Sequence, residues 1–178
     1  NGCRGLHLDG HQGDAAIHYA KACRDIGAIT SLDGGGLREN TLDLLNYIDV
    51  SICAERLAEQ MNLSDAGLLD LLKAKGVKIG GVTRGERGMV WYDETGEIRH
   101  QPPLAVPASA IIDTSGAGDI FHGAYFYARL AHPSEPWEKH FEFARAAAAH
   151  KIQKLGNEAG LPSLKDIQTV NANFRAAA

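Results

Sequence analysis

Three small residues, Gly116, Ala117 and Gly118, stand directly before Asp119, and residues of these types in this order could form a catalytic site. A helix is predicted to begin here, because apolar residues recur downstream at intervals of three and four. The first amides of a helix have no partner inside it and carry partial positive charge, so they bind anions such as phosphate. Glycine also lets a ligand approach the backbone closely. The segment therefore predicts an anion hole at a helix N-terminus.

The carboxylate of Asp119 would repel a phosphate that is merely bound at this anion hole. It makes sense if a phosphoryl group is transferred there, because an attacking hydroxyl must lose a proton that an aspartate can accept. The amides would meanwhile stabilise charge on the phosphoryl oxygens. The alternative interpretation is a tight turn in which Asp119 only caps the helix.

Length and composition narrow the class of protein. The chain has 178 residues, 44% of them hydrophobic, which suits one domain with a real core. The net charge of −4 argues against nucleic-acid or anionic-membrane partners. No apolar run approaches the roughly 20 residues that a membrane-spanning helix needs. Cys3, Cys23 and Cys53 are odd in number and widely spaced, so we expect three unpaired thiols and a cytoplasmic protein.

Strands and helices are predicted to alternate through the first half of the chain. The predicted strands are Leu6–Asp9, Ala28–Leu32, Ile48–Cys53 and Lys78–Thr83, and a hairpin follows over Gly88–Asp93 and Glu97–Gln101. The predicted helices are Gln12–Asp25, Thr41–Asn46, Glu55–Met61 and Asp65–Lys75. Such alternation indicates crossover connections, a mostly parallel sheet with helices on both faces, and ligands at the C-terminal ends of the strands.

The rest of the chain is predicted to be mainly helical. An extended stretch over Leu104–Ile112 is broken by Pro107. Helical periodicity then continues from Phe121 to Ala128 and from Trp137 to Leu155. A last helix starts after Pro162, where Ser163 and Asp166 are spaced as a variant of the capping box.

Residues 113–123 read Asp-Thr-x-Gly-Ala-Gly-Asp-x-Phe-x-Gly, which closely resembles the signature of the ribokinase-like (PfkB-type) carbohydrate kinases. Upstream, residues 82–88 resemble the nucleotide loop of that family. Downstream, the alanine-rich residues 143–149 resemble its helix beside the adenine, and Lys154-Leu155-Gly156 resembles the turn that follows. The resemblance implies a three-layer α/β/α fold. It covers nearly the whole chain, but only as the C-terminal part of such a kinase.

The resemblance assigns roles to individual residues. It makes Asp119 the catalytic base and residues 116–118 the anion hole, with ATP and Mg²⁺ as cofactors and a small sugar as substrate. It places Thr83, Gly85, Gly88, Arg145 and Gly156 around the nucleotide. It puts Asp113 and Ser115 at a loop that binds a monovalent cation such as K⁺.

The chain departs from the family at one motif. Many members carry Asn-x-x-Glu after the strand that here is Ile48–Cys53, but the matching positions are Ala54 and Leu57, with Glu55 out of register. This puts a direct protein contact to the Mg²⁺–phosphate network in doubt. Members of the ketohexokinase-like branch also lack the motif. Asp49–Cys53 followed by Ala58, and Asp33 followed by Arg38, resemble that branch.

Other polar residues have competing interpretations. His7, His11 and His18 with Asp9 and Asp14 could hold a metal, but they belong to different predicted elements, so surface histidines are the favoured reading. Residues 33–36 are a binding loop or a plain turn. Arg38, Arg84 and Arg87 could meet phosphates or remain in solvent. His122 could touch the substrate but is expected to pack locally.

Taken together, we predict a single α/β domain over residues 1–178, the C-terminal portion of an ATP-dependent sugar kinase. The N-terminal part and the β-lid of the family are not recognisable, and Asn1 stands almost directly before a predicted core strand. We therefore expect upstream residues to be missing and the chain alone to be inactive. A nucleoside or vitamin kinase of the same superfamily, and a non-catalytic nucleotide-binding relative, remain alternatives. A homodimer is left open.

Overall fold

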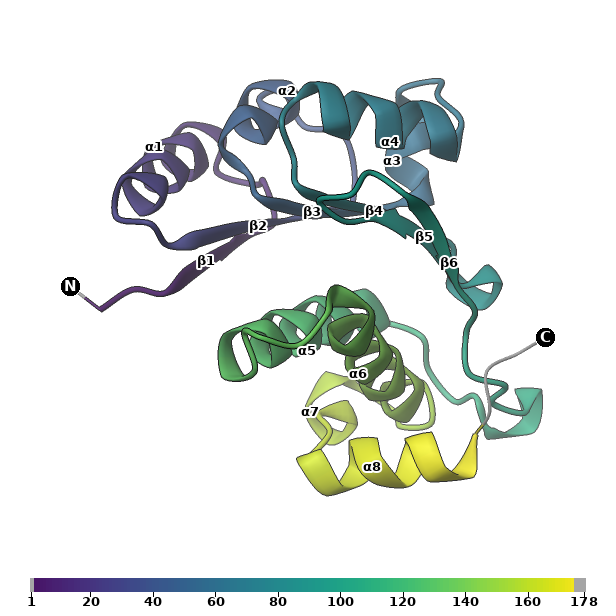
Figure 1. Cartoon of the computed structure of the whole chain (residues 1–178). Coiled ribbons are helices and arrows are strands. Elements are labelled where there is room, and N and C mark those ends of the chain that lie inside the picture. Colours follow the sequence, from purple (N-terminus) through teal and green to yellow (C-terminus); the bar gives the residue numbers. More distant parts are fainter. Residues whose placement is uncertain (1, 175–178) are drawn as a thin grey trace. The chain divides into compact units, whose positions relative to one another are not determined.

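The computed structural model describes residues 2–174. The chain divides into two compact units, Asn1–Gln101 and Pro102–Ala178. The first contains the sheet with its covering helices, and the second is helical (Figure 1). That both units combine into one layered domain stays a prediction.

The first unit is built on a six-stranded sheet whose spatial order follows the sequence, from β1 to β6. The first four strands are parallel, and the last two form an antiparallel hairpin on β4. The sheet is therefore mostly parallel, as predicted. The strands are β1 (Gly5–Leu8), β2 (Ile29–Gly34), β3 (Val50–Ala54), β4 (Ile79–Thr83), β5 (Met89–Tyr92) and β6 (Ile98–Gln101).

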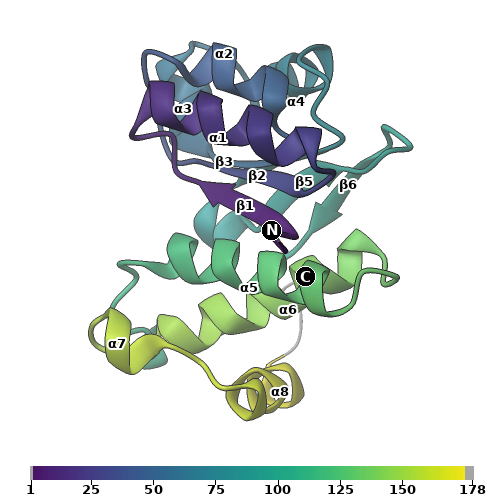
Figure 2. The ribbon, with the colours of Figure 1, turned by 90° about the vertical axis from the view of Figure 1, so that its left-hand side faces the viewer.

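Helices connect the parallel strands, and Figures 1 and 2 both show them on one face of the sheet. Ser64 caps one of them, since its side chain accepts a hydrogen bond from the Gly67 amide at 3.1 Å. Because β1 to β4 are parallel, their C-terminal ends lie along one edge of the sheet. The helices are α1 (Gly13–Asp25), α2 (Thr41–Leu44), continued by a 3-10 turn Leu45–Tyr47, α3 (Glu55–Gln60) and α4 (Asp65–Ala74).

Glycines in β4 make room for large side chains of β5. A Cβ atom on Gly80 would lie 2.4 Å from the ring of Tyr92, which is 2% exposed. The Tyr92 hydroxyl donates a hydrogen bond to the Val77 carbonyl at 3.0 Å, so its polar atom is satisfied inside the core. This packing fixes the register of the hairpin that continues the nucleotide-loop segment.

The second unit begins with an irregular segment that contains a 3-10 turn, Ala108–Ala110, after Pro107. Its main helices are α5 (Ala117–Ala131) and α6 (Trp137–Lys151), which pack side by side (Figure 1). The rings of Phe121 on α5 and Phe141 on α6 are stacked with centroids 6.2 Å apart. A short α7 (Asn157–Gly160) and α8 (Leu164–Asn173) follow, and Ser163 and Asp166 form the predicted capping box.

One predicted helix is too long. Periodicity placed Ile152 and Leu155 on the same helix as Trp137, but α6 ends at Lys151 and Leu155 is 75% exposed. The reason lies in the backbone, because the Ile152 carbonyl accepts hydrogen bonds from the amides of Ile112 and Asp113 at 2.8 and 3.2 Å. These bonds take the place of the next helical turn.

Two further observations concern the cysteines and the membrane. Cys3, Cys23 and Cys53 are free thiols, as expected. Within residues 2–174, none of the helices has the length and apolar character that crossing a bilayer requires.

Candidate active site

The N-terminus of α5 carries the predicted anion-hole segment. Gly116 is the N-cap and adopts a left-handed conformation, with φ +72°. The Ala117 amide donates to the Thr114 carbonyl at 3.2 Å, and the Ile120 amide donates to the Gly116 carbonyl at 3.0 Å. The amides of Gly118 and Asp119 lie between these two bonded amides. Neither has a hydrogen-bond acceptor in the described part of the chain. These two N–H groups are the donors that an anion would meet.

Asp119 lies in the first turn of α5 and is exposed. It is not drawn into an ion pair with any cation of residues 2–174. A carboxylate that is neither buried nor paired is available to accept a proton from a ligand hydroxyl.

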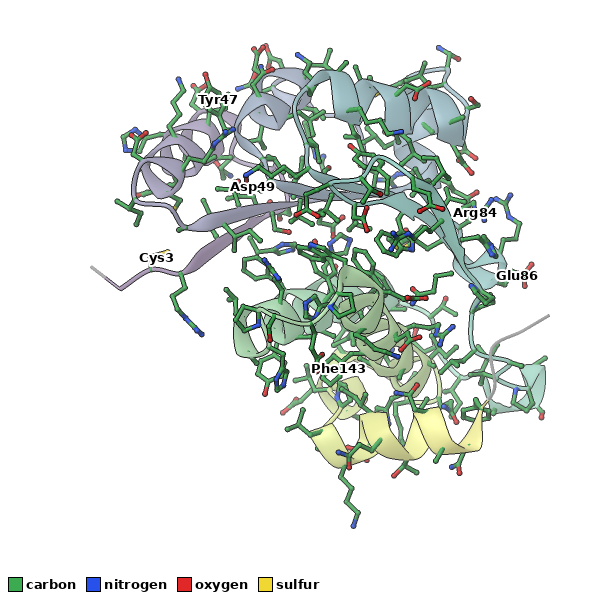
Figure 3. All side chains as sticks on the ribbon, in the orientation of Figure 1. Cys3, Tyr47, Asp49, Arg84, Glu86 and Phe143 are labelled. Carbon is green, nitrogen blue, oxygen red and sulfur yellow. The ribbon has the colours of Figure 1, made fainter. Side chains whose placement is uncertain are left out.

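A cleft of about 750 Å³ opens beside Gly116 and Asp119 within the second unit. Its wall includes Tyr127 of α5 and Phe143 of α6, whose rings are stacked with centroids 6.0 Å apart. Figure 3 labels Phe143 on α6. Most of the lining is apolar, with Asn157, Glu158 and Ser163 as further polar groups. Apolar walls with a few polar groups are typical of a small-molecule site.

Asp113 connects the loop before α5 to the loop after α6. One carboxylate oxygen accepts a hydrogen bond from the Ser115 amide at 2.9 Å, and the other accepts one from the Gly156 amide at 3.0 Å. These backbone amides, with the Ser115 hydroxyl and Lys151, hold the pKa of Asp113 well below its ordinary value. Asp113, Ser115 and Gly156, which the sequence predicted to lie in two different subsites, therefore form one cluster.

Lys151 belongs to this cluster, and the sequence interpretation missed it. Its side chain is fully buried, and Nζ donates to the Asp113 carbonyl at 3.0 Å, the Asp113 carboxylate at 3.2 Å and the Lys154 carbonyl at 3.3 Å. One signal in the sequence could have indicated it. Lys151 lies at the end of the alanine-rich helix, at a position where helical periodicity predicts a buried residue.

The predicted nucleotide loop lies in the first unit. Thr83 ends β4, and its hydroxyl donates to the Cys53 carbonyl at 3.3 Å. Gly85 and Gly88 both adopt positive φ, +56° and +76°, which explains glycine at these positions. The Arg84 amide donates to the Gly88 carbonyl at 2.8 Å and closes the turn, where Figure 3 labels Arg84 and Glu86. The three predicted residues thus form one compact turn at the C-terminal edge of the sheet.

The arginines of this loop form ion pairs with the first residues of α3 and α4. Arg84 forms an ion pair with Asp65 at 3.6 Å, and Arg87 forms one with Glu55. Leu57 is 1% exposed and packs in the core. The positions that match Asn-x-x-Glu therefore offer no carboxylate to a metal, and the nearby Glu55 is held by Arg87.

Arg145 contacts the backbone of its own unit. Its Nη1 donates to the Pro102 carbonyl at 2.8 Å, and burial lowers the pKa of its guanidinium. This bond anchors the segment that enters the second unit. A contact between the Arg145 stem and the adenine stays a prediction.

The histidines near the N-terminus do not converge on a metal. His7 Nδ1 contacts the Ser31 hydroxyl at 3.0 Å, whereas the ring of His18 packs edge-on against Tyr19. No group of three or more ligating side chains suited to a metal ion occurs in residues 2–174. His122 is buried and its Nδ1 lies 3.3 Å from the Tyr125 hydroxyl, in keeping with the expected packing role.

One polar chain does form beyond β1. His11 Nδ1 pairs with Asp9 at 2.9 Å, and Arg38 Nη2 lies 2.6 Å from His11 Nε2. It joins the end of β1 to the segment after β2.

The chain matches a known protein family over most of its length. The sequence model for the pfkB family carbohydrate kinases covers residues 4–164. Among curated proteins, the chain is 27% identical to ribokinase of Lactococcus lactis over 89% of its own length and 49% of the relative. It is 30% identical to deoxyribokinase of Salmonella typhimurium over 71% of the chain and 37% of the relative. It is 32% identical to cytidine kinase of Thermococcus kodakarensis over 49% of the chain and 30% of the relative.

Solved structures show the same fold. Ribokinase of Thermotoga maritima superposes with a TM-score of 0.82 at 22% identity, covering 95% of this chain and 57% of that one. Ribokinase of Arabidopsis thaliana, solved with ribose and ATP, gives 0.79 at 24% identity, covering 93% and 55%. A structure described as ribokinase II of E. coli, with ATP and Mg²⁺, gives 0.77 at 24% identity, covering 94% and 58%.

The extent of these matches bears on what the chain represents. It spans about half the length of the curated ribokinases that it matches. The family match covers nine-tenths of the chain and includes both the nucleotide-loop turn and the Gly-Ala-Gly-Asp segment. The chain therefore belongs to the pfkB family of carbohydrate kinases.

Proposed function

We propose that this chain is the nucleotide-binding and catalytic part of an ATP-dependent kinase that phosphorylates a hydroxyl of a small sugar. The observation that carries the proposal is the start of α5, where the exposed Asp119 adjoins two unpartnered amides behind the left-handed Gly116. Unpartnered amides occur at every helix N-terminus, but here an exposed and unpaired carboxylate stands beside them, and phosphoryl transfer can use both.

In this proposal different residues of the chain accept the proton, stabilise the phosphoryl charge and contact the nucleotide. The Asp119 carboxylate accepts the proton of the attacking hydroxyl, so that the oxygen can bond to phosphorus as the leaving oxygen of ATP departs. The amides of Gly118 and Asp119 donate to the phosphoryl oxygens and offset their growing charge. Thr83, Gly85 and Gly88 would contact the nucleotide through a backbone turn with no Cβ in the way at its two glycines.

Magnesium would neutralise phosphate charge when bound, but the positions that match Asn-x-x-Glu supply no ligand for it. Ala54 and the buried Leu57 stand where many family members carry Asn and Glu, and Glu55 is paired with Arg87. Mg²⁺ is often bound mainly by phosphate oxygens and water, so this chain would leave the ion with the nucleotide. We assign no step to it.

The acceptor is proposed to be a sugar because the family and most of the named relatives are sugar kinases. One relative is named cytidine kinase, and cytidine also presents a ribose hydroxyl. A nucleoside is therefore the second candidate, and a vitamin alcohol the third. Turnover measured with a panel of acceptors at fixed ATP separates them.

Replacing Asp119 by Asn tests the catalytic role. In a longer protein that carries this chain together with the N-terminal part of the family, Asp119→Asn should lower turnover by about 100-fold to 10,000-fold, the range expected for a lost general base. ATP affinity should stay within a few-fold. Asp70→Asn, which removes an exposed carboxylate on α4, is the matched control and should retain full turnover. A non-catalytic nucleotide binder would show no difference between the two variants.

The activity of the 178-residue chain by itself is a separate question. Because the family's sugar site is largely built from the N-terminal part, we propose that the chain alone releases no ADP above background. An ADP-release assay on the chain and on the longer protein checks this, and equal turnover by both would refute it. We further propose a cytoplasmic location and a homodimer.

A further inference from the structure

Lys151 is a charged side chain with no place in the proposed chemistry, yet it is fully buried at the end of α6. Its ammonium group is surrounded by two backbone carbonyl oxygens and one carboxylate oxygen, at 3.0 to 3.3 Å. A buried lysine is costly unless its donors are all satisfied, and here three acceptors meet three N–H bonds. The oxygen cage is therefore built around a cation.

Gly160 gives the Lys151 side chain its room. A Cβ atom on Gly160 would lie 2.1 Å from Cδ of Lys151 and 3.0 Å from Cε. Gly160 does not have a positive φ, so the backbone itself does not require glycine there. The absence of a side chain at position 160 is thus explained by the path of the lysine stem.

The cage holds together the two loops that flank the anion hole. The Asp113 carboxylate that pairs with Lys151 also accepts from the Gly156 amide on one side, and its second oxygen accepts from the Ser115 amide on the other. Ser115 directly precedes Gly116, and Asn157, which directly follows Gly156, lies against Gly116. Removing the central charge would leave one carboxylate and two carbonyls facing one another.

The donor set is the one that a monovalent cation would use. Carboxylate and backbone carbonyl oxygens bind hard cations such as K⁺, and Asp113 and Ser115 were predicted to line such a site. The predicted site does not fit K⁺ in this chain, because the Lys151 ammonium already occupies the oxygens of Asp113. A second cation would have no space beside the Lys151 ammonium and would be repelled by its positive charge.

We propose that the Lys151 ammonium is a built-in replacement for a monovalent cation, so that this chain keeps the loops around its anion hole in place without K⁺. The function of those loops rests on the proposed kinase activity, but the occupancy of the cage does not. Lys151 is a positioning residue, since it acts through Asp113 and touches no reacting atom.

Thermal unfolding of the full chain tests the occupancy directly. The wild-type midpoint should be the same in KCl, NH₄Cl and choline chloride at equal ionic strength. Lys151→Ala opens the cage and should lower the midpoint in choline chloride by about 10 °C, the scale expected for an unpaired buried charge. KCl or NH₄Cl should restore most of that loss, because either cation can enter the vacated space.

Two more variants separate charge from volume. Lys154→Ala removes a neighbouring exposed lysine of the same charge and should show neither the loss nor the salt dependence. Lys151→Met keeps a long stem in the cage, so its loss should not be restored by K⁺. If Lys151→Ala fails to fold in choline chloride, its refolding in KCl would equally show that K⁺ replaces the missing ammonium group.

Kinase assays on the longer protein give a second readout. Wild-type turnover should be unchanged when choline replaces K⁺, whereas Lys151→Ala should depend on K⁺ or NH₄⁺. The proposal is overturned if K⁺ specifically stabilises the wild-type chain, or if neither cation restores Lys151→Ala. Because unfolding is measured without substrates, this failure is distinct from failure of the kinase proposal, which Asp119→Asn decides.

Discussion

Gly116 lies directly against Asn157, so close that a Cβ atom on the glycine would come 2.3 Å from the asparagine side-chain oxygen. Gly116 precedes α5, and Asn157 is the first residue of α7, forty-one positions later in the chain. The loop after α6 therefore supports the helix start that carries the candidate anion hole. The same glycine has a φ of +72°, which other residues adopt only with strain.

Gly116→Ala is predicted to destabilise the second unit and to weaken nucleotide binding. The left-handed conformation alone costs roughly 1–2 kcal/mol for a residue with a Cβ, and the contact with Asn157 adds to it. Relief of that contact would shift the first turn of α5 and move the amides of Gly118 and Asp119. Denaturant unfolding measures the first effect, and titration with ATP measures the second.

Two companion variants identify the cause. Gly116→Ala combined with Asn157→Ala removes the close contact but keeps the backbone strain, so it should recover part of the stability. Gly123→Ala, within α5 and with open space at its Cβ, should raise stability by about 0.5–1 kcal/mol. A Gly116→Ala protein as stable as wild type would contradict the assigned role of this glycine.

Leu57→Glu, which would rebuild half of the missing Asn-x-x-Glu motif, is predicted to unfold the first unit. Leu57 is 1% exposed and lies in the apolar core, where an unpaired carboxylate costs several kcal/mol. Leu57→Met, the control for packing, should cost less than about 1.5 kcal/mol. Circular dichroism against denaturant distinguishes these outcomes, and a folded, stable Leu57→Glu protein would show that this position can reach solvent.

Much of the fold could be predicted because it is encoded locally. The parallel strands follow from the alternation of short apolar runs with helical periodicity, and Ser64 and Ser163 mark two helix starts by their capping chemistry. The start of α5 was also predictable, since glycine, helix periodicity and a following carboxylate stand within a few residues of one another.

The parts that could not be predicted depend on contacts between residues far apart in the chain. Lys151 reads as an ordinary end of an alanine-rich helix, because its partner Asp113 lies 38 positions away. Gly160 reads as a loop glycine, although the lysine stem explains it. The end of α6 is set by the amides of Ile112 and Asp113, which no helical period can reveal.

Ser163→Ala is predicted to lower the stability of the second unit by about 1 kcal/mol, the usual effect of losing an N-cap. The Ser163 hydroxyl accepts from the Asp166 amide at 3.2 Å and donates to the Asp166 carboxylate at 2.6 Å, so the substitution breaks both bonds. Thermal unfolding measures the change. Ser163→Thr, which keeps the hydroxyl, should retain most of the stability, and an equal loss in both variants would exclude the capping explanation.

The stability of the first unit should fall in acid because of Asp49. This carboxylate, 14% exposed, pairs with Lys78 at 2.9 Å and accepts from the Thr30 amide and hydroxyl at 3.0 Å each. Figure 3 labels Asp49, which directly precedes β3. Burial by itself would raise its pKa, but the hydrogen bonds from Lys78 and Thr30 outweigh it and hold the pKa below its ordinary value.

Asp49→Asn is therefore predicted to lower the unfolding free energy by about 1.5–3 kcal/mol at neutral pH, as expected for bonds to a charged group. In the unfolded chain an aspartate takes up its proton near pH 4, whereas the folded Asp49 does so at lower pH. The stabilisation is then complete above about pH 4 and is lost as the pH falls through the folded pKa. The difference between wild type and Asp49→Asn should accordingly shrink in that window.

Urea unfolding at several pH values measures this difference, with the exposed Asp43→Asn as the control for removal of one surface charge. A difference that stays constant down to pH 2, well past the point where an ordinary carboxylate is protonated, would mean that the charge of Asp49 contributes nothing.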